Sequence, residues 1–90
     1  MPDTTSLLGF LAAALTSLSY IPQVRKVLPR RSTGDLSLKM LLILFAGLSM
    51  WIVYGATIGD PIIIAANGVG AALVGFVLGC KVRDIAGAVR

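Results

Sequence analysis

The chain has 90 residues, of which 57% are hydrophobic and only 13% are charged, and its formal net charge is +4 at pH 7. This composition excludes an ordinary soluble domain of the same length and is typical of an integral membrane protein. Every basic residue flanks an uncharged stretch, so the positive charge is explained by membrane topology, and we expect no nucleic-acid partner.

The first membrane span is predicted over residues 5–28. Its uncharged stretch, Leu7 to Val24, would rise about 27 Å as a helix, close to the thickness of the hydrocarbon core of a bilayer. The alternative is a cleaved signal peptide, but that would place basic residues before the apolar stretch, whereas here they follow it. We therefore expect a permanent span.

Pro22 and Gln23 interrupt this span near its end. Pro22 has no N–H to donate to the carbonyl group of Leu18, and its ring crowds that group, which costs up to about 3 kcal/mol inside a helix. The helix should therefore bend here, with Gln23 available to satisfy the freed backbone groups. The bend is either a hinge for the inner half of the span or a static kink, and the residues themselves leave both open.

The second span is predicted over residues 38–58, after a loop that begins at Pro29. Asp35 or Ser37 is expected to cap its first turn. The stretch from Leu41 to Gly59 has no charged side chain and is long enough to cross a bilayer as a helix.

The third span, residues 61–81, follows a tight turn predicted at Gly59 and Asp60. Asp60 suits the N-cap and Pro61 the first helical position, so the second and third spans should be antiparallel neighbours. Small residues recur every four positions in the third span, which favours close packing and a central position, although such residues are also common in membrane spans generally. These are Ala71, Gly75 and Gly79, and the first span has Gly9, Ala13 and Ser17 in the same pattern.

The basic residues all lie on one side of this predicted bundle. By the positive-inside rule, the N-terminus is outside and the C-terminus is cytoplasmic. Three helices cannot both enclose a polar passage and pack their small residues together, so we predict a parallel homodimer with a two-fold axis along the membrane normal. The bases are Arg25, Lys26, Arg30, Arg31, Lys39, Lys81, Arg83 and Arg90.

Trp51 and Asn67 should lie at the same depth on adjacent spans, about 9 to 11 Å from the outer ends. Trp51 is deep for a residue of an interfacial belt, whereas Tyr54, on the same helix face, fits one. Asn67 either forms a hydrogen bond between helices or contacts a ligand. An aromatic face and an amide at one depth, duplicated by a two-fold axis, suit a ligand with apolar C–H faces and hydroxyl groups, such as a sugar.

These motifs, in this order, resemble the SemiSWEET sugar transporters, bacterial members of the PQ-loop superfamily. The resemblance covers essentially the whole chain and rests on Pro22-Gln23, the loop RRSTGDLS, the segment WIVYG at residues 51–55, and Asn67. It implies an all-α membrane protein, a bundle of three transmembrane helices in the spatial order 1-3-2 that functions as a parallel homodimer. Parallel repeats of this kind are known from the larger SWEET transporters.

The resemblance also implies roles for individual residues. Trp51 and Asn67 match the substrate-contacting positions of the family. One position departs from the family pattern, because Ile58 stands where the outer gate often has an arginine. The remaining matches are Tyr54 and Asp60 at the outer gate, and Pro22 with Gln23 at the hinge.

The sequence thus predicts a single domain, residues 1–90, that is a facilitative, uncoupled transporter of small sugars, mono- or disaccharides, in the bacterial cytoplasmic (inner) membrane. It is not expected to be an enzyme or to hold a metal or cofactor; Cys80 is the only cysteine. Two alternatives stay open: a PQ-loop carrier of another small solute, such as an amino acid, and a non-transporting membrane scaffold or assembly subunit. Carriers of amino acids usually use ionisable residues for proton coupling, and the uncharged stretches of the three spans contain no acid, histidine or base.

Overall fold

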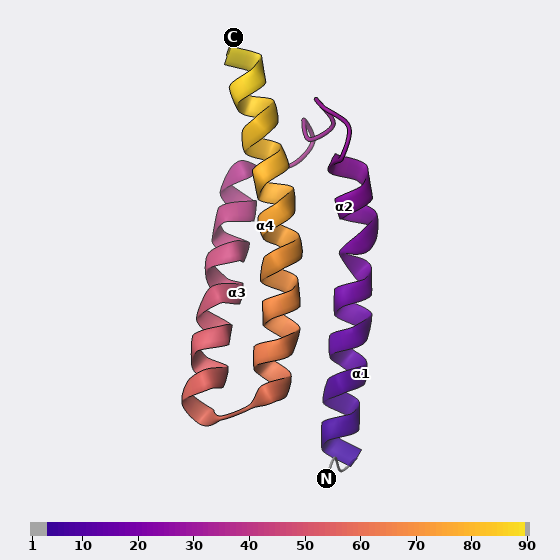
Figure 1. Cartoon of the computed structure of the whole chain (residues 1–90), viewed down its shortest axis with the longest axis vertical. Coiled ribbons are helices and arrows are strands. Elements are labelled where there is room, and N and C mark those ends of the chain that lie inside the picture. Colours follow the sequence, from indigo (N-terminus) through magenta and orange to yellow (C-terminus); the bar gives the residue numbers. More distant parts are fainter. Residues whose placement is uncertain (1–3, 90) are drawn as a thin grey trace.

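A computed structural model describes residues 4–89, which form four helices (Figure 1). Three segments are long and apolar enough to cross a membrane, the first of them made of two helices in succession. The predictions for residues 1–3 and 90 lie outside the described part of the chain. The helices are α1 (Thr4–Ser19), α2 (Ile21–Val27), α3 (Leu38–Ile58) and α4 (Pro61–Val89).

α4 is the central helix of the bundle. α3 packs on one side of it, and α1 and α2 pack on the other (Figure 1). Within residues 4–89, α1 and α3 do not contact each other. The predicted all-α bundle and its spatial order 1-3-2 are therefore confirmed. The described chain measures 54 × 24 × 14 Å, and since its thinnest dimension is close to the diameter of one helix, the helices form a single layer.

The interruption of the first span lies just before the proline, and not at it. α1 ends at Ser19, and the N–H of Tyr20 donates to the carbonyl oxygen of Ser17 at 3.1 Å. α2 begins at Ile21 and holds Pro22 in its first turn, where the missing N–H has no intrahelical partner to lose. Tyr20 keeps helical angles (φ −78°, ψ −20°), so the break is mild and α2 continues along the same side of α4.

The sequence offered two residues, Asp35 or Ser37, as the cap of the second span, and one of them caps it. Ser37 accepts a hydrogen bond from the N–H of Met40 at 3.1 Å and caps α3. Asp35 instead pairs with Lys26, and this bond holds the pKa of the Asp35 carboxyl group below its usual range. Both side chains of the pair are largely exposed, so it contributes little to stability.

The turn between α3 and α4 has the predicted chemistry. Gly59 adopts the left-handed conformation (φ 69°) and its N–H donates to the last turn of α3. Asp60 Oδ1 then accepts from the N–H groups of Ile62 (3.0 Å) and Ile63 (3.2 Å), which makes Asp60 the N-cap of α4. α4 begins at Pro61 and continues past residue 81, the expected end of the third span, to Val89.

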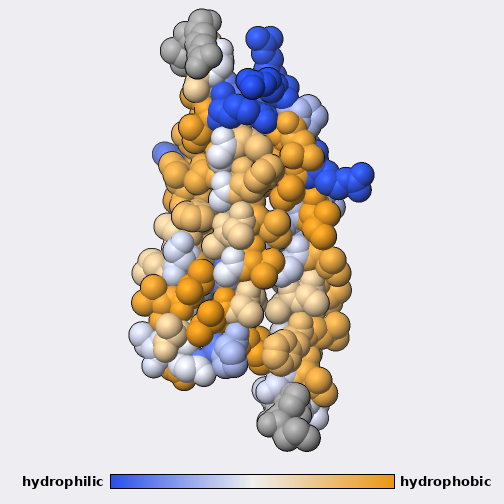
Figure 2. Space-filling view, in the orientation of Figure 1, coloured by the Kyte–Doolittle hydropathy of each residue, from blue (hydrophilic) through white to orange (hydrophobic). Residues whose placement is uncertain are grey.

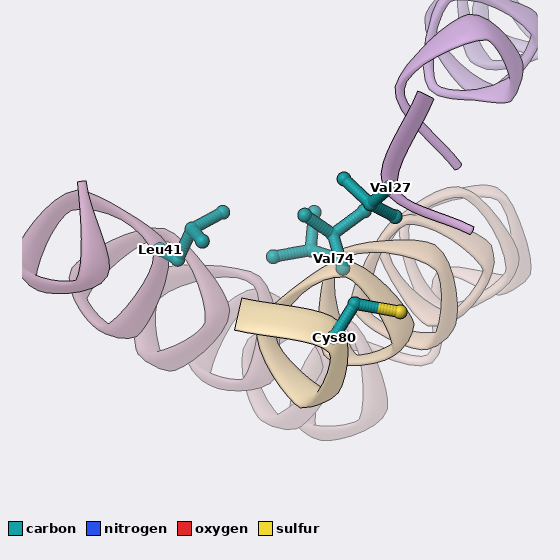
Figure 3. Close-up of a cluster of buried hydrophobic side chains, with 5 residues drawn as sticks. Val27, Leu41, Val74 and Cys80 are labelled. Carbon is teal, nitrogen blue, oxygen red and sulfur yellow. The ribbon is translucent and has the colours of Figure 1, made fainter. Parts of the chain in front are cut away.

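The buried core is small and includes residues at the end of α2 and the start of α3, so it lies toward one end of the bundle. Figure 3 shows its side chains between the helices. We call this end of the bundle the basic end, because it holds the loop 28–37 and the last turns of α4 with their bases. Most other apolar side chains on all helices are exposed, as Figure 2 shows for one face. Because one copy buries so little, most of its apolar surface must face lipid or another chain. The core consists of Val27, Leu41, Val74, Val77 and Cys80.

Two of the three small residues predicted to form a seam on the third span are packed. Ala71 is buried, and a Cβ atom added at Gly75 would lie 3.1 Å from Cε2 of Phe45. The prediction is wrong for Gly79 within this chain, because a Cβ there would meet nothing within 4 Å. A tighter contact is at Gly55, where a Cβ would lie 2.8 Å from Cγ2 of Ile63. Gly55 therefore sets how closely α3 approaches α4.

Candidate functional site

Trp51 and Tyr54 form an open aromatic surface on α3. Their rings meet edge to face, with centroids 5.5 Å apart and planes at 82°. Both residues are about half exposed, at 51% and 49%. With Gly47 and Met50 they line an open hollow of about 380 Å³, which we call the aromatic hollow. Such a surface can stack on the apolar C–H face of a ligand.

Asn67 lies on α4 and is half-buried. Its Nδ2 donates to the carbonyl oxygen of Ile63, one turn earlier in the same helix, at 2.9 Å. Among residues 4–89 the amide makes no hydrogen bond to another helix, so it does not join helices within one chain. Asn67 does not line the aromatic hollow. One chain therefore brings Trp51 and Tyr54 together but leaves the predicted amide outside their hollow.

Asp60 lies at the opposite end of the bundle from the bases. It borders an open hollow of about 530 Å³. Phe10 of α1 lines one side of this hollow, and Ile58, before the turn between α3 and α4, lines the other. The Asp60 carboxylate is oriented by the two N–H groups that it caps at the start of α4. In this conformation the described partners of Asp60 are backbone groups, which is consistent with the absence of an arginine at position 58.

The break at Tyr20 lies beside a cavity of about 250 Å³ among α2, α3 and α4. Gln23 lines this cavity, but within residues 4–89 it donates no hydrogen bond to the backbone, contrary to the expectation that it compensates for the proline. The ring of Tyr20 lies against α4 at Gly70, where an added Cβ would be 3.4 Å from Cε2 of the tyrosine. Because Gly70 has no side chain, the ring of Tyr20 can pack against α4 at the break between α1 and α2. The cavity leaves space for α2 to move. The other lining residues are Ser19, Tyr20, Leu36, Met40, Leu41, Leu44, Val74 and Val77.

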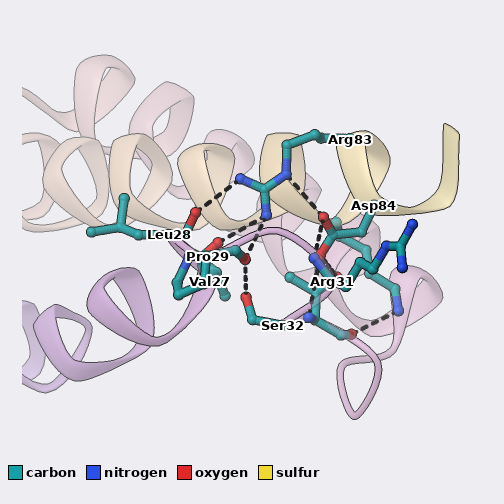
Figure 4. A network of polar contacts seen from close by, with 9 residues as sticks. Val27, Leu28, Pro29, Arg31, Ser32, Arg83 and Asp84 are labelled. Atoms are coloured by element: carbon teal, nitrogen blue, oxygen red, sulfur yellow. Dashed lines mark hydrogen bonds and ion pairs between the residues drawn. The ribbon is translucent and has the colours of Figure 1, made fainter. Parts of the chain in front are cut away.

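Arg83 joins α4 to the end of α2 (Figure 4). Its guanidinium group donates to the carbonyl oxygens of Val27 (3.1 Å), Leu28 (3.1 Å) and Pro29 (2.9 Å). The last carbonyl groups of a helix have no intrahelical partner, so a cation in this position satisfies them and complements the helix dipole. The C-terminus of α2 is therefore fastened to α4 although Pro29 ends the helix.

Asp84 fastens the following loop to α4. Its Oδ1 accepts from the N–H of Arg31 at 3.0 Å, and its Oδ2 accepts from the hydroxyl group of Thr33 at 2.7 Å and from the N–H of Thr33 at 3.3 Å. Thr33 is only 1% exposed, and Lys81 Nζ donates to its carbonyl oxygen at 2.8 Å. Sequence analysis missed this network; the available signal was an acidic residue, Asp84, among the bases that follow the third span.

Similarity to known proteins covers most of the chain. Residues 4–64 match the family model described as PQ loop repeat. The chain is 44% identical over 82 residues to a protein named sugar transporter SemiSWEET from Bradyrhizobium diazoefficiens, covering 91% of this chain and 95% of the relative. A protein of the same name from Leptospira biflexa is 38% identical over 79 residues, covering 88% of this chain and 93% of the relative.

The fold is similar to that of a solved structure as well. A chain described as a bacterial homologue of SWEET transporters superposes with a TM-score of 0.84 at 32% identity, covering 91% of this chain and 99% of that one. The residues matched by the family model include Pro22, Trp51 and Asp60, whereas Asn67 lies beyond them.

Proposed function

Because the chain belongs to the PQ-loop repeat family, we propose that it is a facilitative transporter of small sugars in the bacterial cytoplasmic membrane, and not an enzyme. The observation that carries this proposal is the similarity to sugar transporters along nearly their whole length. The aromatic hollow at Trp51 and Tyr54 supports it, because a half-exposed aromatic pair inside a membrane span suits the C–H face of a sugar ring.

The active unit is a parallel homodimer. One chain is a single layer of helices and cannot surround a substrate, while its aromatic hollow is open to the outside of the chain. A second copy related by a two-fold axis along the membrane normal would close the aromatic hollow and duplicate its residues. In this dimer Trp51 supplies the stacking face, and Asn67 offers the amide oxygen and the remaining N–H that its own helix leaves free.

Alternating access uses the break in the first span. α2 moves about Tyr20 and Pro22 at the inner side, with Gln23 beside the cavity into which α2 can move. Tyr54 and Asp60 belong to the outer gate, near the turn between α3 and α4. Only one gate is open at a time, so the sugar site is reached from one side and then from the other.

Transport is uncoupled, because the uncharged stretches of the three spans, Leu7 to Val24, Leu41 to Gly59 and Pro61 to Cys80, contain no acid, histidine or base that could relay a proton. The orientation follows from the bases: the N-terminus and Asp60 are outside, and the basic end is cytoplasmic. The single domain of three spans then crosses the membrane with its C-terminus inside.

The experiment is a flux assay on purified protein in liposomes, with radiolabelled glucose, sucrose and alanine as alternative substrates. We expect a sugar to equilibrate across the membrane without accumulating when a proton or sodium gradient is imposed. Trp51→Ala should abolish flux, whereas Val53→Ala, which shortens an exposed side chain elsewhere on α3, should leave it near the wild-type rate. Flux of alanine alone would favour the amino-acid carrier, and no flux of any solute through a folded dimer would favour the scaffold.

A further inference from the structure

A further hollow, at the basic end, is distinct from the transport residues. It has a volume of about 600 Å³ and lies between the loop 28–37 and the last turns of α4. Figure 2 shows hydrophilic side chains gathered at this end above the apolar body of the bundle. We infer that this arginine hollow binds the phosphate headgroup of an anionic phospholipid. Its lining residues are Arg30, Arg31, Arg83, Asp84, Gly87 and Ala88.

Two guanidinium groups in the arginine hollow are free to bind a ligand. The side chains of Arg30 and Arg31 are exposed and form no hydrogen bond or ion pair with the other described residues. The backbone of Arg31 is nevertheless held in place, because its N–H donates to Asp84 and its φ of 66° is a conformation that residues with a side chain rarely adopt. The loop thus presents an arginine on a supported backbone.

Asp84 does not neutralise these arginines. Its Oδ1 accepts from Arg83 Nε at 2.9 Å and from the N–H of Arg31, and its Oδ2 accepts from two donors of Thr33. Both carboxylate oxygens are therefore occupied by donors other than the two free guanidinium groups. The charged residues that line the arginine hollow, Arg30, Arg31 and Arg83 against Asp84, carry a formal charge of three minus one, or +2. This excess of positive charge attracts anions.

The arginine hollow lies at the depth of lipid headgroups. The uncharged stretch from Pro61 to Cys80 rises about 30 Å, which matches the hydrocarbon core, so the turns of α4 that follow enter the headgroup layer. Apolar side chains border the polar network at this point: Leu28 is 55% exposed and Val82 is 52% exposed. A lipid can place its phosphate between the arginines and its acyl chains along such apolar surface.

Phosphate is the anion that this chemistry favours. The planar guanidinium fork matches two oxygens of a phosphate, and basic pockets at the cytoplasmic side of membrane bundles suit anionic lipid headgroups. Inorganic phosphate offers the same charge but gains nothing from the adjoining apolar surface, so we commit to a lipid. The site unites the loop and α4, which the Arg83 and Asp84 network already holds together.

The test measures binding of dioleoylphosphatidylglycerol to delipidated protein in a neutral detergent. Native mass spectrometry detects the bound lipid, and the shift in melting temperature reports stabilisation of the protein. The site variant is Arg30→Gln with Arg31→Gln. The matched control is Arg25→Gln with Lys39→Gln, which removes the same charge from exposed bases outside the arginine hollow. A third variant, Arg30→Lys with Arg31→Lys, keeps the charge but removes the guanidinium forks.

We expect phosphatidylglycerol to bind and stabilise the wild type, and phosphatidylcholine to do neither. The site variant should bind about thirtyfold more weakly, the control should change less than threefold, and the lysine variant should fall between them. An equal loss of lipid affinity in the site variant and in the control would overturn the proposal, because it would show that the lipid is attracted by the overall charge of the protein and not by the arginine hollow. Equal binding of phosphatidylcholine, or displacement of the lipid by low millimolar inorganic phosphate, would also overturn it. The comparison of lipids on the wild type holds even if a variant fails to fold.

Discussion

The contact between α3 and α4 at Gly55 makes a sharp prediction for Gly55→Ala. A Cβ there would lie 2.8 Å from Cγ2 and 3.2 Å from Cβ of Ile63, and 3.1 Å from Cγ1 of Ile64. Ile63 is β-branched and has one strongly preferred rotamer in a helix, so it cannot turn away and the two helices must separate. Overpacking of this kind costs about 1–3 kcal/mol, whereas alanine gains about 0.5–1 kcal/mol over glycine as a helix former. The difference between these ranges is a loss of about 0–2.5 kcal/mol, centred on about 1 kcal/mol.

The assay is thermal unfolding of the purified dimer, followed by fluorescence and size-exclusion chromatography. Gly55→Ala should lower the melting temperature by on the order of 5 °C. Gly75→Ala should have a smaller effect, because its Cβ would meet the edge of the Phe45 ring, which can move. Gly87→Ala, with nothing within 4 Å, should be neutral or stabilising. If Gly55→Ala were as stable as Gly87→Ala, the absence of a side chain at position 55 would not be needed for α3 and α4 to pack together.

The remaining predictions concern the site, the hinge and the basic end. Asn67→Ala should abolish sugar flux in liposomes while the protein still elutes as a folded dimer; wild-type flux would assign Asn67 to packing. Pro22→Ala supplies an N–H that can bond to the carbonyl group of Leu18 and join α1 and α2 into one continuous helix. It should therefore slow flux without weakening sugar binding, as measured by calorimetry on the same sample; unchanged flux would show that the proline is no hinge. Arg83→Gln should speed amide hydrogen exchange in residues 27–33, because the carbonyl groups of Val27, Leu28 and Pro29 lose the guanidinium group that ties them to α4. Unchanged exchange there would show that Arg83 does not hold the loop.

The order of the helices could be predicted because membrane proteins impose strong local rules. A span needs about 20 apolar residues, and every backbone group inside lipid must be satisfied within the chain, so uncharged stretches predict helices directly. The caps at Ser37 and Asp60 were predictable for a similar reason, since capping depends on residues next to each other in the sequence. The central place of the third span followed from its small residues, although Gly79 does not pack as expected.

The interruption of the first span shows where local rules stop. The sequence predicted a bend at Pro22, but a proline is tolerated in the first turn of a helix, so the chain begins a new helix at Ile21 and breaks at Tyr20. Tyr20 can occupy the break because Gly70, fifty residues later, leaves room for its ring. That pairing depends on the register between two helices, which neither segment specifies alone.

Sequence alone determined the three spans, the family, the distribution of charge and the aromatic face at Trp51 and Tyr54. Each of these features depends on residues that are close together in the sequence or that lie one helical turn apart. Only the tertiary structure showed that Arg83 and Asp84 bind the loop across more than fifty positions of the chain, that Thr33 is buried, and that Arg30 and Arg31 stay free beside them. A hydrogen bond requires atoms within about 3 Å, and for residues far apart in sequence that distance is set by how helices pack.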